Sequence, residues 1–79
     1  MTNLEKYTEV FAESLNISKE ETAGLVYRGI DEWDSVGHMA LISALEDAFD
    51  IMFDTDDIID LSSFEKGKEI LKKYDVEFN

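Results

Sequence analysis

Ser35 is the side chain whose place in the sequence most clearly suggests chemistry, because it stands where a long polar connection passes into a helical pattern. A serine at such a junction is expected to be exposed. The free backbone N–H groups of a helix start, together with the positive end of the helix dipole, favour a phosphate carried on its hydroxyl. The same position also suits an ordinary helix N-cap, which needs no function. The residue type alone leaves both interpretations open.

Two other side chains near Ser35 are candidates for the same site. His38 is the only histidine and lies three residues further along the expected helix, so it could hydrogen-bond a phosphate or respond to pH. An exposed polar position is the favoured alternative for it. Trp33 is expected to anchor the connection to the core, since a large aromatic side chain offers much apolar area to a small domain. The chain has no cysteine, so any thiol chemistry must come from a cofactor.

The elements that position these residues are expected to be helical. Capping-box spacings recur, proline is absent, and apolar residues repeat every three to four positions. We predict an all-α fold, a small four-helix bundle with three longer helices, a short third helix and a long loop between helices one and two. A single domain is expected over residues 1–79, with helices at 3–15, 35–50, 55–60 and 63–74.

Particular residues are expected to set the ends and the buried faces of these helices. The expected N-terminal caps are Thr2 with Glu5, Ser18 with Glu21, Thr55, and Ser62 with Glu65. The side chains expected to pin the long connection are Leu25, Val26, Tyr27 and Ile30. The side chains expected to face inward are Val36, Met39, Ile42, Leu45 and Phe49, and on the short helix Ile58, Ile59 and Leu61. Residues after Tyr74 are expected to form a loose tail.

The charge of the chain is strongly negative and unevenly distributed. Asp and Glu number 19 against 7 Lys and Arg, and the formal net charge is −12. Residues 31–60 contain ten acidic side chains and no basic one. This distribution argues against nucleic-acid binding and favours a basic partner, although solubility alone could account for it. No apolar run is long enough to cross a bilayer, so we expect no membrane insertion. The absence of cysteine fits a reducing cytoplasm, and the large net charge favours a monomer.

A longer pattern resembles the acyl carrier protein family. The sequence Asp34-Ser35-Val36 is followed by the segment from Leu41 to Phe49, which has the form L-x-x-x-L-E-x-x-F. An Asp-rich short turn and a helix from Phe64 to Tyr74 then follow where that family has its third and fourth helices. In that family the serine carries a prosthetic group. The resemblance therefore implies that Ser35 bears a covalent 4′-phosphopantetheine arm derived from coenzyme A.

The resemblance implies that the chain itself is not an enzyme. A phosphopantetheinyl transferase would direct the Ser35 hydroxyl at the pyrophosphate of coenzyme A, release the nucleotide and leave a phosphodiester. The terminal thiol of the arm would then hold an acyl or aminoacyl group as a thioester and present it to biosynthetic enzymes. Asp34 is expected to shape the helix start or to meet the basic transferase, and a plain cap is equally compatible with it.

The partners implied by the resemblance are the transferase, an acyl- or aminoacyl-loading ligase, and a downstream transferase or condensing enzyme with a basic docking surface. The side chains expected to form the docking surface on this chain are Val36, Met39, Glu46, Asp47, Asp54, Asp56 and Asp57. Core packing is an equal alternative for Val36 and the favoured one for Met39. Each acid, taken singly, can be a merely solvated charge.

The sequence departs from the carriers of fatty-acid synthesis. Those carriers commonly place acids at the positions held here by Gly37 and Ala40, and a residue smaller than Trp33 before the Asp-Ser pair. The segment from Trp33 to Met39 looks more like specialised stand-alone bacterial carriers, which serve surface-polysaccharide, amino-acid or secondary-metabolite pathways. Gly37, Ala40 and Ala44 leave room in which an acyl chain could lodge between helices, or they simply permit close packing.

Three other classes of protein compete with this interpretation. A calcium sensor is suggested by the spacing of Asp54, Asp56 and Glu65, but Ile58 and Ile59 stand where an EF-hand loop needs a ligand and a glycine, so no metal site is expected. A hydrolytic enzyme is disfavoured, because no base, nucleophile and orienting residue can be assembled. An acidic helical adaptor that binds a basic protein without a prosthetic group remains the alternative.

Overall fold

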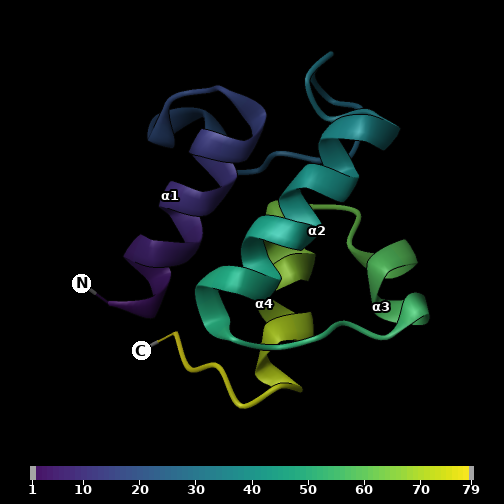
Figure 1. The fold of residues 1–79 in the computed structure, drawn as a ribbon. Helices are drawn as coiled ribbons and strands as arrows, with labels where there is room; N and C mark the ends of the chain where they lie inside the picture. The colour runs from purple at the N-terminus through teal and green to yellow at the C-terminus, as the bar shows by residue number, and fades with distance from the viewer. Residues whose placement is uncertain (1, 79) are drawn as a thin grey trace.

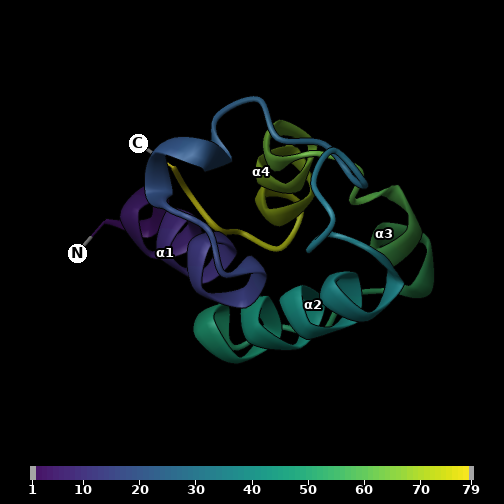
Figure 2. The ribbon, with the colours of Figure 1, turned by 90° about the horizontal axis from the view of Figure 1, so that it is seen from above.

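The computed structural model describes residues 2–78, and the predicted all-α class is confirmed. The elements are α1 over Asn3–Leu15, the 3₁₀ turn η1 over Lys19–Thr22, α2 over Ser35–Phe49, α3 over Thr55–Asp60 and α4 over Phe64–Lys72. Figures 1 and 2 show α1, α2 and α4 around a common centre, with the short α3 across the bundle from α1. No strand occurs within residues 2–78. None of the helices in this range has the length and apolar character that a membrane span requires.

The ends of α1 and α2 follow from local backbone chemistry. Thr2 and Glu5 form the predicted capping box: the Glu5 amide donates to Thr2 Oγ1 over 3.1 Å, and the Thr2 amide donates to Glu5 Oε1 over 3.0 Å. α2 begins at Ser35, as predicted, and ends one residue earlier than predicted. Asp50 ends it because this residue adopts the left-handed conformation, with φ of 53°.

The caps of α3 and α4 differ by one residue from the predicted ones. Asp54 precedes α3, and Thr55 is its first helical residue instead of its cap. α4 starts after Ser63, whose Oγ accepts from the amide three residues later over 2.9 Å. The predicted cap at Ser62 is wrong. The Tyr27 amide donates a hydrogen bond to the Ser62 carbonyl over 2.8 Å, which keeps Ser62 in the connection before the helix.

Aromatic side chains form the centre of the core. Tyr7 and Phe11 of α1 meet Phe64 of α4, with ring centroids 4.8 to 5.0 Å apart. The Tyr7 hydroxyl donates to the Phe64 carbonyl over 2.6 Å, and burial raises the pKa of Tyr7 above its ordinary value. The other most deeply buried side chains are Leu15, Trp33, Leu41, Ile42, Leu45, Leu61, Ile70 and Leu71. The three longer helices and the long connection therefore share one core.

The long connection is fastened to the start of α4 by backbone hydrogen bonds. The Phe64 amide donates to the Leu25 carbonyl and the Tyr27 amide to the Ser62 carbonyl, each over 2.8 Å. The predicted pinning side chains are buried at Leu25, partly buried at Tyr27 and Ile30, and half exposed at Val26. The prediction is wrong for the Val26 side chain, because at this point the connection is held by backbone hydrogen bonds of the neighbouring residues Leu25 and Tyr27.

Several apolar side chains that the periodicity assigned to the interior are exposed. Val36 and Met39 of α2 are 80% and 54% exposed, and Ile59 of α3 is 73% exposed. The buried residues of α2 are Leu41, Ile42 and Leu45. Because α2 carries apolar residues on more than one side, periodicity alone could not decide which side packs on the other helices.

The segment after α4 is not the loose tail that the sequence predicts. Asp75 adopts a left-handed conformation, with φ of 67°, and the chain turns back toward α1. Val76 is buried, and Phe78 packs edge-to-face on Tyr7 with ring centroids 5.3 Å apart. Burial of Val76 and packing of Phe78 on Tyr7 stabilise this segment against the rest of the fold.

Candidate functional site

Ser35 is the first residue of α2, and its side chain is exposed. The cap of this helix is Asp34, whose Oδ1 accepts from the Gly37 amide over 2.9 Å and whose carbonyl accepts from the His38 amide over 2.7 Å. The ordinary capping role is therefore filled by Asp34. The Ser35 hydroxyl is left outside the capping hydrogen bond. The helix α2, which Ser35 begins, starts at its upper end in Figure 1.

Tyr27 places a second hydroxyl beside Ser35. Its hydroxyl oxygen lies 3.3 Å from Ser35 Oγ, within hydrogen-bonding distance. Its ring makes edge-to-face contacts with His38, at 5.3 Å between centroids, and with Trp33, at 6.1 Å. Sequence reasoning assigned Tyr27 only a packing role. An irregular connection between the two residues carries no periodic signal, so nothing in the spacing could have brought the hydroxyls together.

His38 uses both ring nitrogens within the fold. Trp33 Nε1 donates to His38 Nδ1 over 3.0 Å, and His38 Nε2 lies 2.7 Å from the Ile58 carbonyl oxygen. Because an indole N–H can only donate, Nδ1 is the acceptor and Nε2 carries the proton that is donated to Ile58. His38 is partly buried, so the favoured prediction of an exposed polar position is wrong. A bond from His38 to a phosphate would require one of these contacts to break.

Trp33 and Gly37 explain how the connection reaches α2. Trp33 is fully buried, which confirms its predicted anchoring role. A Cβ atom at Gly37 would collide with the carbonyl oxygen of Glu32, so the absence of a side chain allows the backbone to pass against the first turn of the helix. Of the two uses foreseen for Gly37, close packing is the one it serves. With the backbone of Glu32 packed against Gly37, Trp33 lies in the core and Ser35 lies on the surface.

A small pocket is lined in part by Tyr27. Its volume is about 250 Å³, and its lining residues are Tyr27, His38, Ile58, Ile59, Leu61 and Ser62. Tyr27 therefore contacts Ser35 and also borders the pocket. The lining is mainly apolar, with a phenol and an imidazole among its residues. Such a pocket suits a small apolar group tethered near Ser35.

Most of the predicted docking residues are on the surface. The exposed ones are Val36, Met39, Asp47, Asp54 and Asp56. The alternative of core packing is thereby excluded for Val36 and Met39. Met52, which the sequence did not single out, is also an exposed apolar side chain, with 83% of its surface accessible. Contact with a partner stays a prediction for all of them.

Two predicted docking acids, Asp57 and Glu46, accept hydrogen bonds within the fold. The Asp57 side chain is only 7% exposed; Oδ1 accepts from Lys73 Nζ over 2.5 Å and Oδ2 from the Tyr74 hydroxyl over 2.6 Å. These two hydrogen bonds hold the pKa of Asp57 below its ordinary value. Glu46 is partly buried, and its Oε2 accepts from the Phe53 amide over 2.9 Å. The assignment of Asp57 to the docking surface is wrong, because its side chain is buried against Lys73 and Tyr74, which follow α4.

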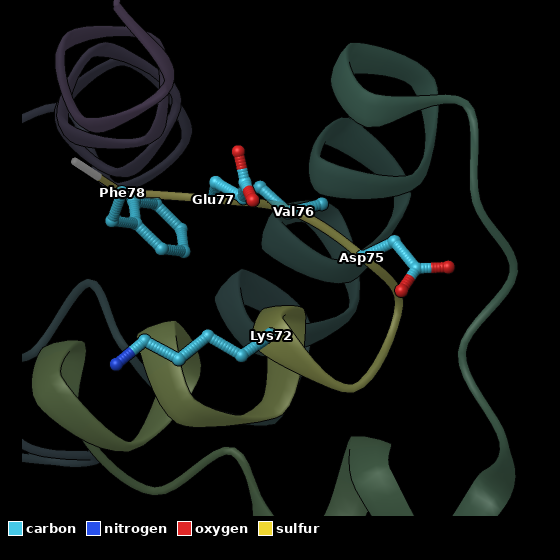
Figure 3. Close-up of a pocket in the computed structure, with 5 residues that line it drawn as sticks. All are labelled: Lys72, Asp75, Val76, Glu77 and Phe78. Carbon is cyan, nitrogen blue, oxygen red and sulfur yellow. The ribbon is translucent and has the colours of Figure 1, made fainter.

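A second pocket lies away from Ser35, at the end of α4. Its volume is about 370 Å³, and Figure 3 shows its lining residues, Lys72, Asp75, Val76, Glu77 and Phe78. In this view the Phe78 ring extends from the final segment on the side of α4, and Lys72 extends along α4. The pocket is formed where the final segment turns back, and it shares no residue with the surroundings of Ser35.

The fold argues against the calcium-sensor interpretation. Thr55–Asp60 forms α3, so the residues that would supply an EF-hand loop are largely helical. Within residues 2–78, no three side chains of the His, Asp or Glu type are grouped so that they could hold a metal ion.

Comparisons of the chain with protein-family models, with curated proteins and with solved structures find no match.

Proposed function

We propose that this chain is an acyl or aminoacyl carrier protein that bears a 4′-phosphopantetheine arm on Ser35. The observation that carries the proposal is the exposed Ser35 hydroxyl at the first residue of α2, with the capping role taken by Asp34. A modifying enzyme can reach such a hydroxyl, whereas it could not reach one inside the bundle. The Asp34-Ser35-Val36 start and the four-helix order support the resemblance to the acyl carrier protein family.

The side chains around Ser35 fit a phosphodiester. During attachment, Ser35 Oγ bonds to the phosphorus of coenzyme A that carries the pantetheine. The pyrophosphate bridge breaks and adenosine 3′,5′-bisphosphate leaves, while the hydroxyl proton of Ser35 passes to a base of the transferase. The Tyr27 hydroxyl lies beside Ser35 Oγ, and both stand at the positive end of the α2 dipole. When bound, the arm supplies a thiol, which this cysteine-free chain lacks, and holds the cargo as a thioester.

The surface around α2 and α3 supports docking of basic enzymes. Val36 and Met39 expose apolar area on the same helix as Ser35, and Asp47, Asp54 and Asp56 add exposed negative charge. Charges of this kind accelerate encounter with basic partners more than they tighten binding. The proposed partners are the phosphopantetheinyl transferase, a loading ligase and a downstream transferase or condensing enzyme. The chain would serve them as a cytoplasmic monomer in a specialised biosynthetic pathway.

The proposal is tested by loading the arm in vitro. The purified chain is incubated with coenzyme A, Mg²⁺ and a broad-specificity phosphopantetheinyl transferase, and its intact mass is measured. We expect one phosphopantetheine increment on the wild type and none on Ser35→Ala. Ser43→Ala, which removes an exposed hydroxyl further along α2, is the matched control and should load normally. A folded wild-type chain that gains no mass would instead favour the acidic adaptor.

A further inference from the structure

Backbone and ring contacts hold the hydroxyl of Tyr27 beside Ser35, although attachment of the arm does not itself require this hydroxyl. We propose that Tyr27 is the positioning residue of this site. Its hydroxyl bonds to Ser35 Oγ before modification and donates to an oxygen of the phosphodiester afterwards. The inference rests on the proposed function of Ser35, and it adds a role for a residue outside the Asp34-Ser35-Val36 motif.

The backbone of Tyr27 is held from both sides. Its amide donates to the Ser62 carbonyl over 2.8 Å, which ties it to the residues before α4. The following residue, Arg28, donates its amide to the Trp33 carbonyl over 3.0 Å, which ties it to the segment that leads into Ser35. Tyr27 therefore occupies a fixed place within the connection, beside the residues that precede α4, although it belongs to no helix.

The ring of Tyr27 is held as well. Its edge-to-face contacts with Trp33 and His38 limit rotation of the ring away from α2. His38 is itself fixed by Trp33 on one ring nitrogen and by the Ile58 carbonyl on the other. A ring held by two neighbours that are themselves anchored keeps its hydroxyl 3.3 Å from Ser35 Oγ at a low entropic cost.

Modification makes the direction of the hydrogen bond unambiguous. In the unmodified chain, either hydroxyl can be the donor. Once Ser35 Oγ is esterified it has no proton to give, so Tyr27 must donate, and the charged phosphate oxygens are stronger acceptors than a serine hydroxyl. The contact should therefore strengthen on attachment and should restrict rotation about the Ser35 Cβ–Oγ bond, which sets the direction in which the arm leaves the protein.

The test compares loaded wild type with loaded Tyr27→Phe, which keeps the ring and removes only the hydroxyl. The ³¹P spectrum gives the phosphodiester resonance, and the three-bond coupling between phosphorus and Ser35 Cα gives the populations of the Cβ–Oγ rotamers. We expect the resonance to shift and the population ratio of the preferred rotamer to fall about fivefold, the factor that one hydrogen bond of ordinary net strength provides. Loaded Ser43→Ala should retain the wild-type spectrum.

Three outcomes decide between the claims. An altered rotamer ratio in Tyr27→Phe, with an unchanged melting temperature and unchanged amide spectrum outside the site, supports the positioning role. A loaded Tyr27→Phe with the wild-type resonance and rotamer ratio overturns it and leaves the carrier proposal intact. A wild-type chain that cannot be loaded overturns the carrier proposal and this inference together.

Discussion

The indole N–H of Trp33 donates to Nδ1 of His38 over 3.0 Å, and the two rings stack with centroids 6.2 Å apart and planes inclined by 19°. The other ring nitrogen of His38 lies 2.7 Å from the Ile58 carbonyl oxygen. A single imidazole thus joins the end of the long connection to α2 and α3. Ser35 lies where the connection meets α2, so the shape of the site depends on this contact.

Replacing His38 should destabilise the fold by leaving the buried Trp33 N–H without its acceptor. We expect His38→Phe to lower the free energy of unfolding by about 1–3 kcal/mol, the usual cost of an unsatisfied buried donor. In a Trp33→Phe background the same change should cost clearly less, because the donor is already gone. Urea unfolding of the two single variants and the double variant measures the coupling. Strictly additive effects would contradict the hydrogen bond.

Asp34 should act on the site through the helix start. Asp34→Ala removes the acceptor of the Gly37 amide and should cost about 1 kcal/mol, whereas Asp34→Asn keeps a capping oxygen and should cost only a few tenths. We expect the Ala variant to be loaded more slowly, since the first turn that carries Ser35 frays, and the Asn variant to be loaded at the wild-type rate. Thermal unfolding and mass-resolved loading kinetics check both expectations. Equally slow loading of the two variants would show that the charge of Asp34 is what the transferase needs.

Gly67 should resist a substitution that usually stabilises helices. Gly to Ala in a helix interior ordinarily gains about 1 kcal/mol. At Gly67 the new Cβ would collide with the Tyr7 hydroxyl oxygen and lie 2.7 Å from Leu61 Cδ1. We therefore expect Gly67→Ala to lower stability by about 1–3 kcal/mol, as overpacking of a core does. Chemical denaturation measures the change, with the exposed Glu69→Ala on the same helix as control. A stabilised Gly67→Ala would disprove the close approach of α1 to α4.

Asp57 should make the stability of the fold depend on pH. Hydrogen bonds from Lys73 and Tyr74 lower its pKa, so its contribution is complete above the ordinary carboxyl pKa of 3.8 and is lost as the pH falls through the lower folded value. The pKa values of Lys73 and Tyr74 are raised above 10.5 and 10.0, so their contributions persist through neutral pH and are lost only in strong base.

Asp57→Asn provides the measurement. It should cost about 1–3 kcal/mol at neutral pH, the range for hydrogen bonds to a charged group. The difference from wild type should begin to shrink below about pH 4, where the carboxyl of the unfolded chain becomes protonated, and should disappear once the pH falls below the lower folded pKa. Urea unfolding across this pH range is the test, and the exposed neighbour Asp56→Asn is the control. A difference that stays constant into strong acid would mean that the charge of Asp57 is not involved.

Local chemistry made much of this protein predictable from its sequence. Capping spacings, the absence of proline and apolar periodicity depend on residues within a few positions of one another, and they predicted the helical class and the helix boundaries to within about two residues. The start of α2 at Ser35 is of this kind. The burial of Trp33 was also predictable, because a large aromatic side chain contributes much apolar area to the core of a small domain.

Contacts between residues far apart in the chain were decided only by the tertiary structure. The charge pattern could not distinguish Asp57, which is buried against Lys73 and Tyr74, from its exposed neighbour Asp56. Nor could spacing bring the Tyr27 hydroxyl to Ser35 across an irregular connection. The physical reason is the same in both cases: sequence periodicity reports which side of one helix a residue occupies, while the partner on that side is chosen by how whole elements pack.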